Sequence, residues 1–275
     1  MTQLFGSLRN LQSITICSNA ITGQFFRNIP ENITSIGWKI TAKCNISSNL
    51  TLAGKGGNLK NFSFTTASSV SNLDLDLIAS LINEMPNLMK MKILSYVKLR
   101  QCFHVNGLEK LDINLKRISL NCFQPMYSLK KLDMTVNSIR EKKVVSYLKS
   151  FPNLQYLHLS FTYLDTFTLK MIESLCHLRT LKSFYYDDFK YKSETYSTLT
   201  DSSLNSLCEA VSMMSNVSEF DFLLINSTAT VADFMQIILT LKSIAVQRPS
   251  HVFRLRFQEF YIPETLCLPE NLFVG

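Results

Sequence analysis

A short apolar pattern that returns along the whole chain constrains its fold more than any other feature. Leu129-x-x-Leu132-x-Met134 begins one segment, and Leu154-x-x-Leu157-x-Leu159 repeats the same spacing 25 residues later. Between them lie a helical pattern over 139–148 and a Phe151-Pro152-Asn153 turn. A strand, a helix, a turn and a second strand make one repeat of a solenoid, because each unit buries its apolar face only against its neighbours.

The motif can be placed ten times, with varying apolar residues. The steps between successive units are 22, 26, 29, 20, 21, 25, 27, 36 and 35 residues. One six-residue pattern of this kind occurs in any strand, whereas ten in series are specific. The units begin at Leu11, Ile33, Leu59, Leu88, Leu108, Leu129, Leu154, Leu181, Val217 and Val252.

The connections between these units differ in kind. Apolar spacing predicts further helices over 72–85, 164–177, 200–214 and 230–246. The connections 94–107 and 114–128 are too short for a full helix and predict turns. The remaining segments predict a surface loop over 41–58 that contains Gly54-Lys-Gly-Gly57, a polar insertion over 187–199, and an irregular C-terminal cap over 260–275.

The ten units resemble the leucine-rich repeat, whose pattern is L-x-x-L-x-L-x-x-N/C. The irregular steps and the helical connections resemble the ribonuclease-inhibitor-like and F-box-associated types. This resemblance covers roughly residues 4–260 and implies an α/β solenoid, a horseshoe with a parallel concave sheet and helices or turns on the convex side. The ninth-position Asn occurs only as Asn19 and Asn137, with Thr162 as a substitute, so we expect a ragged solenoid.

The length and composition fit one repeat array. At 275 residues with 46% apolar residues, the chain can bury a continuous core, and we expect a single domain over 1–275. The formal net charge of +7 is unevenly spread, because residues 88–149 hold 13 Lys or Arg against four Asp or Glu. Such a segment predicts either a solvated basic face or contact with an acidic protein, a membrane surface or nucleic acid.

The cysteines and the N-terminus predict a reduced compartment. Seven scattered cysteines without any C-x-x-C favour buried thiols over disulfides, as at Cys176 and Cys208. The N-terminus has no signal-peptide pattern and no window predicts a membrane span, so we expect a cytoplasmic or nuclear protein. Six N-x-S/T sequons favour the alternative of secretion only weakly: Asn32, Asn45, Asn49, Asn61, Asn216 and Asn226.

No motif in the chain predicts an enzyme or a cofactor. The four histidines lack metal-ligand spacing, and Cys176 next to His177 at a helix end is better explained as a buried thiol than as a nucleophile. Gly54-Lys-Gly-Gly57 lacks the spacing of a phosphate-binding loop and predicts a flexible loop. We therefore expect no catalytic residue, no metal and no cofactor.

Strand alternation predicts which side chains the sheet presents to a partner. In L-x-x-L-x-L the apolar residues face the core, and the third and fifth residues face outward. The face is expected to run from basic through aromatic to acidic, with a basic end. Its predicted protein-binding residues are Lys90, Lys92, Lys110, Asp112, Lys131, Asp133, Tyr156, His158, Tyr185, Asp187, Glu219, Asp221, Arg254 and Arg256.

The resemblance implies a non-enzymatic interaction module. The leading hypothesis is the substrate-recognition part of an F-box-type ubiquitin ligase subunit, which would bind a ligase adaptor only if an F-box lies upstream of Met1. Alternatives are a stand-alone cytosolic scaffold or inhibitor and, less favoured, an extracellular recognition domain. Nucleic acid is disfavoured, because acidic residues at 187–221 would repel phosphates.

Overall fold

The computed structural model of the 275-residue chain forms two compact units, residues 1–136 and 137–275. Each unit is described on its own, and a single domain over the whole chain stays a prediction. The structure describes residues 10–18, 23–41, 50–67, 75–99, 102, 104–118, 123–139, 141–164, 174–188, 208–209, 211–224, 231–257 and 266–274.

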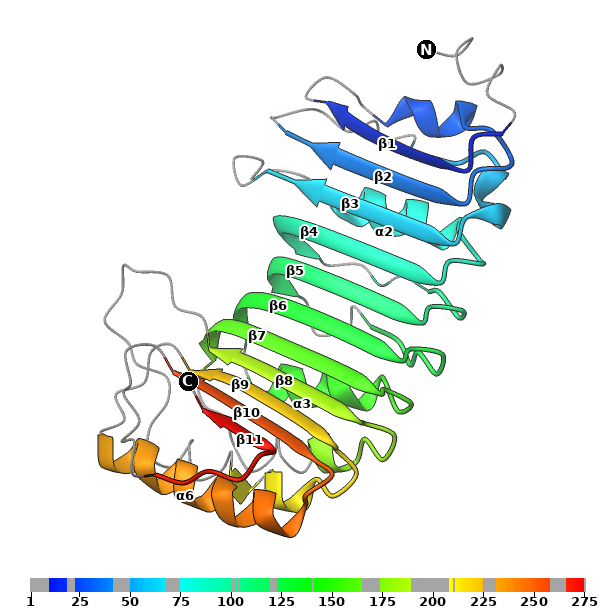
Figure 1. Cartoon of the computed structure of the whole chain (residues 1–275). Helices are drawn as coiled ribbons and strands as arrows, with labels where there is room; N and C mark the ends of the chain where they lie inside the picture. The colour runs from blue at the N-terminus through cyan, green and yellow to red at the C-terminus, as the bar shows by residue number, and fades with distance from the viewer. Residues whose placement is uncertain are drawn as a thin grey trace. The chain divides into compact units, whose positions relative to one another are not determined.

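In the first unit, parallel strands lie side by side in the order in which they occur in the chain (Figure 1). Short 3-10 helices and one α-helix connect some of them. The elements are β1 (Ser13–Ser18), η1 (Gln24–Asn28), β2 (Ser35–Ile40), η2 (Lys55–Asn58), β3 (Asn61–Thr66), α2 (Leu75–Asn83), β4 (Lys90–Leu99), β5 (Lys110–Ile118) and β6 (Lys131–Ile139).

The second unit repeats this arrangement with longer connections. Its strands are again parallel and in chain order. The elements are α3 (Glu141–Lys149), β7 (Tyr156–Leu164), β8 (Ser183–Asp188), β9 (Glu219–Leu224), α6 (Val231–Gln247), β10 (Val252–Phe257) and β11 (Leu272–Val274). Both units therefore have a solenoid-like architecture of repeated parallel strands with few helices.

The sequence motif determines where each strand begins. Nine strands begin two residues after the first apolar residue of a motif, because that residue sits in the turn: the Leu88 amide donates to the carbonyl of Met85, for example. β10 is the exception. Its register pairs Val252 with Glu219, the third residue of the preceding motif. The tenth unit therefore begins at Ser250, and the predicted start at Val252 is wrong by two residues.

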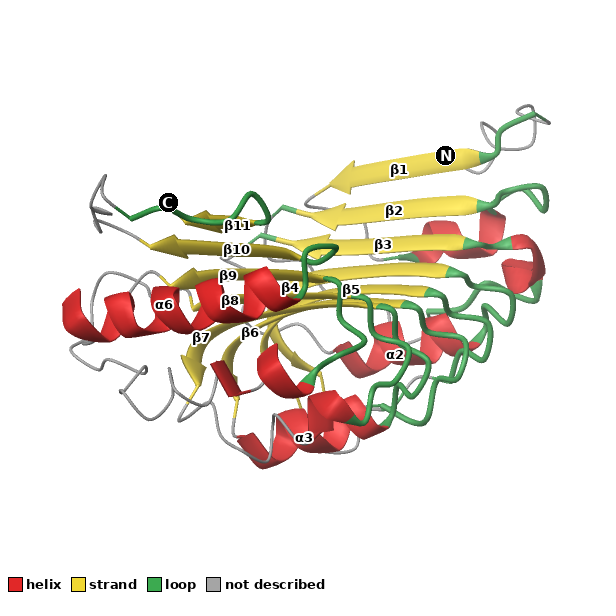
Figure 2. Ribbon diagram, turned by 60° about the horizontal axis from the view of Figure 1, so that its bottom comes forward, coloured by secondary structure: helices red, strands yellow, loops and turns green. Residues whose placement is uncertain are grey.

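Alternation along the strands separates the core from the outward face. The fourth and sixth motif residues, such as Leu132 and Met134, are buried in every repeat except the first, where Ile14 and Ile16 are half-buried. The third and fifth residues are at least partly accessible in nearly every repeat. In each unit the described helices lie on one side of the strands (Figure 2), and the accessible third and fifth residues occupy the other side. We call the side that carries the third and fifth residues the open face.

Side chains in the turns join successive repeats. The residue before a motif is often Asn, Ser or Thr, and its side chain donates to a backbone carbonyl of the preceding repeat. These bonds, 2.6–3.2 Å long, run from Asn32 to Leu11, Asn58 to Glu31, Asn87 to Gly57, Ser128 to Asn106, Thr180 to Leu154 and Asn216 to Arg179. The side chains of Asn19, Asn137 and Thr162, at the ninth position of their motifs, lie outside the described part of the chain.

Several predicted connections take a more definite form. The helices predicted over 72–85 and 230–246 correspond to α2 and α6. Those over 164–177 and 200–214 are described only near their ends, where residues 174–176 and 211–213 are helical. β4 and β5 extend into the connections predicted as turns. Within the predicted irregular cap, Leu272–Val274 forms β11 beside β10.

Residues 50–58, within the predicted surface loop, form a packed turn in which Ala53, Gly54, Gly57 and Asn58 are exposed. Leu50, Leu52 and Gly56 are buried, and the Nζ of Lys55 donates to the carbonyl of Ile29 at 3.1 Å. Gly56 lies against the backbone of Glu84, whose carboxylate accepts bonds from Thr51 and Leu52. Residues 42–49 lie outside the described part of the chain.

Candidate functional site

The open face of the first unit carries two rows of aligned side chains. Strand register places the third motif residues of six strands next to one another, and it does the same for the fifth. The third-position row is Ser13, Ser35, Asn61, Lys90, Lys110 and Lys131. The fifth-position row is Thr15, Gly37, Ser63, Lys92, Asp112 and Asp133.

Three lysines stand directly beside one another in the third-position row. Lys90 pairs with Lys110 across β4 and β5, and Lys110 pairs with Lys131 across β5 and β6. Neighbouring strands are about 4.8 Å apart, and like charges directly opposite one another destabilise a sheet. We call Lys90, Lys110 and Lys131 the lysine ladder. Because aligned like charges repel one another, the ladder favours a role in binding over a role in the stability of the sheet.

On β4–β6 the fifth-position row carries both positive and negative side chains, unlike the ladder. The Nζ of Lys92 is 2.7 Å from a carboxylate oxygen of Asp112, so these two charges are paired. Asp133 is the next residue along the same row and is half-buried. The part of the face predicted to be basic in the first unit is therefore a single row of lysines with carboxylates on one flank.

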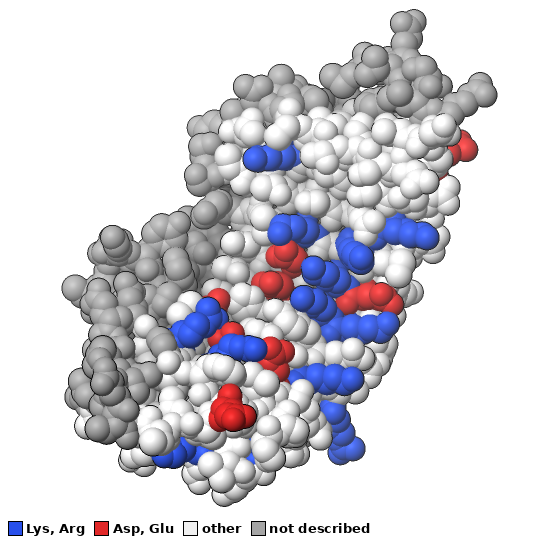
Figure 3. Space-filling model, viewed as in Figure 1, with Lys and Arg blue, Asp and Glu red and all other residues white. Residues whose placement is uncertain are grey.

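A hollow of about 440 Å³ lies beside the ladder, over β1–β5. Its floor is formed by small side chains of the two rows on β1–β3, above all Thr15, Gly37 and Ser63. Lysines stand at its rim: Lys39, Lys90, Lys92 and Lys110. In the space-filling view this face holds few charged side chains over β1–β3, and basic side chains gather next to that area (Figure 3).

Gly37 makes room for the side chain of Thr15. A Cβ atom at position 37 would lie 2.9 Å from the Oγ1 atom of Thr15. Because glycine has no side chain, the fifth-position row does not project from the sheet at this point. Serine at position 63 continues the low floor towards β4.

The second unit presents an aromatic group on the same kind of face. The rings of Tyr156 and Tyr185 lie 4.9 Å apart between centroids, and the ring of His158 lies 6.4 Å from that of Tyr185. The Nε2 atom of His158 is 2.8 Å from a carboxylate oxygen of Asp187. These four residues of the predicted aromatic centre do lie together.

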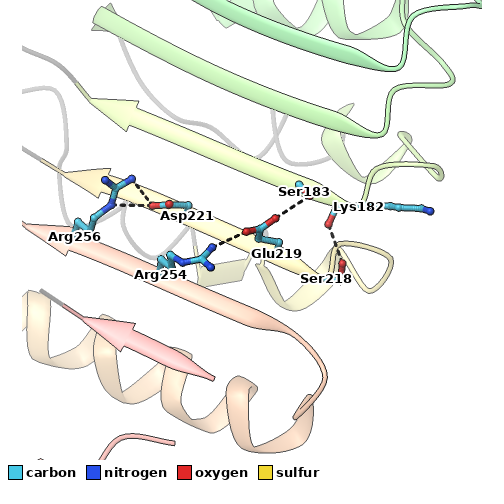
Figure 4. A network of polar contacts seen from close by, with 7 residues as sticks. All are labelled: Lys182, Ser183, Ser218, Glu219, Asp221, Arg254 and Arg256. Carbon is cyan, nitrogen blue, oxygen red and sulfur yellow. Dashed lines mark hydrogen bonds and ion pairs between the residues drawn. The ribbon is translucent and has the colours of Figure 1, made fainter. Parts of the chain in front are cut away.

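Beyond the aromatic group, acidic and basic residues form ion pairs (Figure 4). Arg254 donates to Glu219 at 2.6 Å, and Arg256 donates to Asp221 at 2.7 and 3.1 Å. Both pairs are offset by two residues from the strand register, in which Arg254 stands beside Asp221. The predicted acidic patch and basic end are therefore not separate regions, because their charges are paired. Because they are paired with arginines, these carboxylates repel phosphates less than the sequence predicts.

Glu219 is the centre of this network. It accepts hydrogen bonds from Arg254, Ser183 and the Tyr185 hydroxyl. Burial would raise the pKa of Glu219, but these three bonds outweigh it and lower the pKa below its usual value. Burial, followed by the bond to Glu219, raises the pKa of Tyr185. Tyr185 therefore stays protonated and donates its hydroxyl proton to the network.

The lowered pKa of Glu219 predicts a pH-dependent contribution to stability. A carboxyl group whose pKa is lower in the folded state stabilises the fold above its unfolded pKa, near 4.5, and loses that effect as the pH falls through the folded value. We expect the stability of Glu219→Gln to fall less than that of the unaltered chain between pH 6 and pH 3, in urea unfolding at several pH values. Equal slopes for the two proteins would contradict this role.

The thiols differ from the prediction of uniform burial. Cys208 is buried, and burial raises its pKa to about 11. Cys17 and Cys267 are exposed, so the prediction of buried thiols is wrong for these two. Cys176 is half-buried beside the exposed His177, and neither residue lies on the open-face rows.

The sequons that can be placed have structural roles. The Nδ2 atoms of Asn32 and Asn216, where a glycan would be attached, donate to backbone carbonyls of the preceding repeats. Asn61 lines the hollow. Asn45, Asn49 and Asn226 lie outside the described residues. Attachment of a glycan at Asn32 or Asn216 would compete with the bonds that join successive repeats.

Searches for other kinds of site give two findings for the described part of the chain. No group of three or more His, Cys, Asp or Glu side chains is arranged to hold a metal ion there. None of the helices in those ranges has both the length and the apolar character needed to cross a membrane.

Comparison of the sequence with protein-family models and with curated proteins gives no match.

Proposed function

We propose that the chain is a non-enzymatic protein-interaction module, built as a leucine-rich repeat solenoid, that binds its partner on the open face. The observation that carries this proposal is the open face itself. In the first unit this face has a hollow and a ladder of like charges, and in the second unit, taken by itself, it carries an aromatic group.

The aromatic group of the second unit supports protein binding in particular. Tyr156 and Tyr185 are half-buried, their rings are in contact, and the hydroxyl of Tyr185 is bonded to Glu219. They therefore lose little side-chain entropy when a partner covers them. Tyrosine and arginine are enriched among the residues that dominate binding energy at protein interfaces. Paired charges around such a centre supply orientation more than affinity.

Site-specific photo-crosslinking tests this function. A benzophenone amino acid is placed at the exposed Lys39 or Arg256 on the open face, outside the floor of the hollow and the aromatic group. Gln236 and Gln247, exposed on α6, are the matched control positions. In an extract of the cells that make the protein, we expect the open-face positions to give one discrete adduct that the α6 positions do not give. The captured protein, once purified, should bind the unaltered chain directly. Adducts only from α6, or the same adducts from all four positions, would contradict the proposal.

Within this function, the resemblance to F-box-associated repeats leads us to propose a substrate receptor of a ubiquitin ligase, with a stand-alone scaffold or inhibitor as the alternative. Sequencing the transcript upstream of Met1 separates the two. An in-frame F-box supports the receptor, and its absence from the complete coding sequence supports the scaffold. The open face is the partner-binding surface in both cases.

A further inference from the structure

We infer that the hollow and the lysine ladder of the first unit form a binding track for an acidic, extended segment of the partner. This inference rests on the proposed function and specifies its chemistry. The track follows the third-position row across the strands. It runs from the ladder on β4–β6 to the part of the hollow whose floor lies on β1–β3.

The polar groups around the track are overwhelmingly hydrogen-bond donors or hydroxyls that can donate. Lys90 and Lys110 have no ion pair, and Ser35, Asn61, Ser63 and Thr65 have no side-chain hydrogen bond, with any residue in the described ranges. The one carboxylate in the lining, Asp112, is paired with Lys92. The second unit contrasts with this, because Arg254 and Arg256 are both paired with carboxylates. The track therefore offers unused donors to a ligand that brings acceptor oxygens.

The dimensions of the track fit an extended peptide. Six strands about 4.8 Å apart span about 24 Å, which about seven residues cover at about 3.4 Å each. Alternate side chains of such a segment lie about 6.8 Å apart on one side, so two carboxylates can face the three lysines of the ladder. The hollow, at about 440 Å³, has room for a further side chain of the same segment.

Two observations favour a peptide over a nucleic acid. Single-stranded nucleic acids are held by aromatic stacking as well as by cations. The aromatic residues in the lining of the hollow, Trp38 and Phe62, are both buried in the core and present no ring to a base. In addition, the carboxylates of Asp112 and Asp133 flank the ladder, so only a narrow line of negative charge can lie along it.

The test uses a fluorescein-labelled eight-residue peptide with glutamate at every second position, together with the same peptide carrying glutamine instead. We expect the full chain to bind the glutamate peptide at least tenfold more tightly than the glutamine peptide in fluorescence anisotropy. Lys90→Glu with Lys110→Glu should weaken binding of the glutamate peptide at least tenfold. Lys90→Gln with Lys110→Gln, which only removes charge, should weaken it several-fold and confirm the effect in a variant with little risk to folding.

Matched variants separate the track from net charge. Lys60→Glu with Lys182→Glu makes the same change in net charge at two exposed lysines outside the track, and binding should stay within twofold. Ser63→Phe fills the hollow while the ladder is intact, and it should weaken binding several-fold. Equal losses in the Lys60/Lys182 and Lys90/Lys110 variants would overturn the inference.

Two further outcomes would overturn the track and leave the proposed function separately testable. A ten-nucleotide single strand that binds more tightly than the glutamate peptide, with the same dependence on Lys90 and Lys110, would assign the track to nucleic acid. A partner captured by crosslinking that binds the Lys90/Lys110 variant as tightly as the unaltered chain would place recognition elsewhere on the open face.

Discussion

Replacing Gly56 with alanine is expected to lower the free energy of unfolding by about 3 kcal/mol, the upper end of what overpacking usually costs. A Cβ atom at this position would overlap with the carbonyl oxygen of Glu84, which is backbone and cannot rotate away. The surrounding contacts resist movement, because the Glu84 carboxylate holds Thr51 and Leu52 at 2.9 and 2.7 Å. Asn87 also donates to the carbonyl of Gly57 at 2.6 Å. Urea unfolding of the two proteins measures the difference.

The neighbouring glycine supplies the control. A Cβ atom at Gly57 would meet no heavy atom within 4 Å, and this residue is exposed. Gly57→Ala should therefore leave stability unchanged or raise it by about 0.4–1 kcal/mol, through the lower entropy of the unfolded chain. Equal losses for the two alanine variants would show that the packing around Gly56 is not the cause.

Leu157→Ala is expected to lower the free energy of unfolding by about 2–5 kcal/mol, the usual cost of truncating a buried leucine. Leu157 is the fourth residue of the seventh motif, is 0% exposed and stands beside Phe184 on the next strand. The cost includes the cavity left between β7 and β8, since neighbouring side chains collapse only in part. Chemical unfolding monitored by circular dichroism gives the difference.

The same substitution at a surface leucine is the matched control. Leu239 lies on α6 and is 46% exposed. Leu239→Ala should change stability by less than about 1 kcal/mol, because little apolar area is lost and alanine is the better helix former. A loss at position 239 as large as that at position 157 would mean that the repeats do not bury the motif leucines as described.

The strands could be predicted from the sequence because the motif combines two local signals. Alternation of apolar residues shows which side chains face the core, and a turn before each unit shows where pairing begins. The start of the tenth unit was predicted wrongly because Ser250 stands where other units have an apolar residue. Val252, two residues later, has the apolar character expected at that first position. The placement was off by an even number of residues, so the outward direction of Arg254 and Arg256 was still correct.

Contacts between repeats were harder to predict, because they depend on register. The pairs Arg254–Glu219 and Arg256–Asp221 are diagonal, and no pattern within one strand shows them. The hollow was missed although its signal was available. When the motifs are aligned, the third and fifth residues of the first three units are all small: Ser13, Thr15, Ser35, Gly37, Asn61 and Ser63. The hydrogen bonds in the turns between repeats also had a visible signal, because Asn precedes the first apolar residue of several units.

The aromatic cluster of the first unit has a practical consequence for studies of unfolding. Trp38, the one tryptophan in the sequence, is 1% exposed and packs at an edge against Phe26 and Phe64. Tryptophan fluorescence will therefore report the unfolding of residues 1–136 alone, whereas circular dichroism reports both units. Coincident transitions in the two signals would show that the units unfold cooperatively as one domain, and separate midpoints would show that each is an independent folding unit.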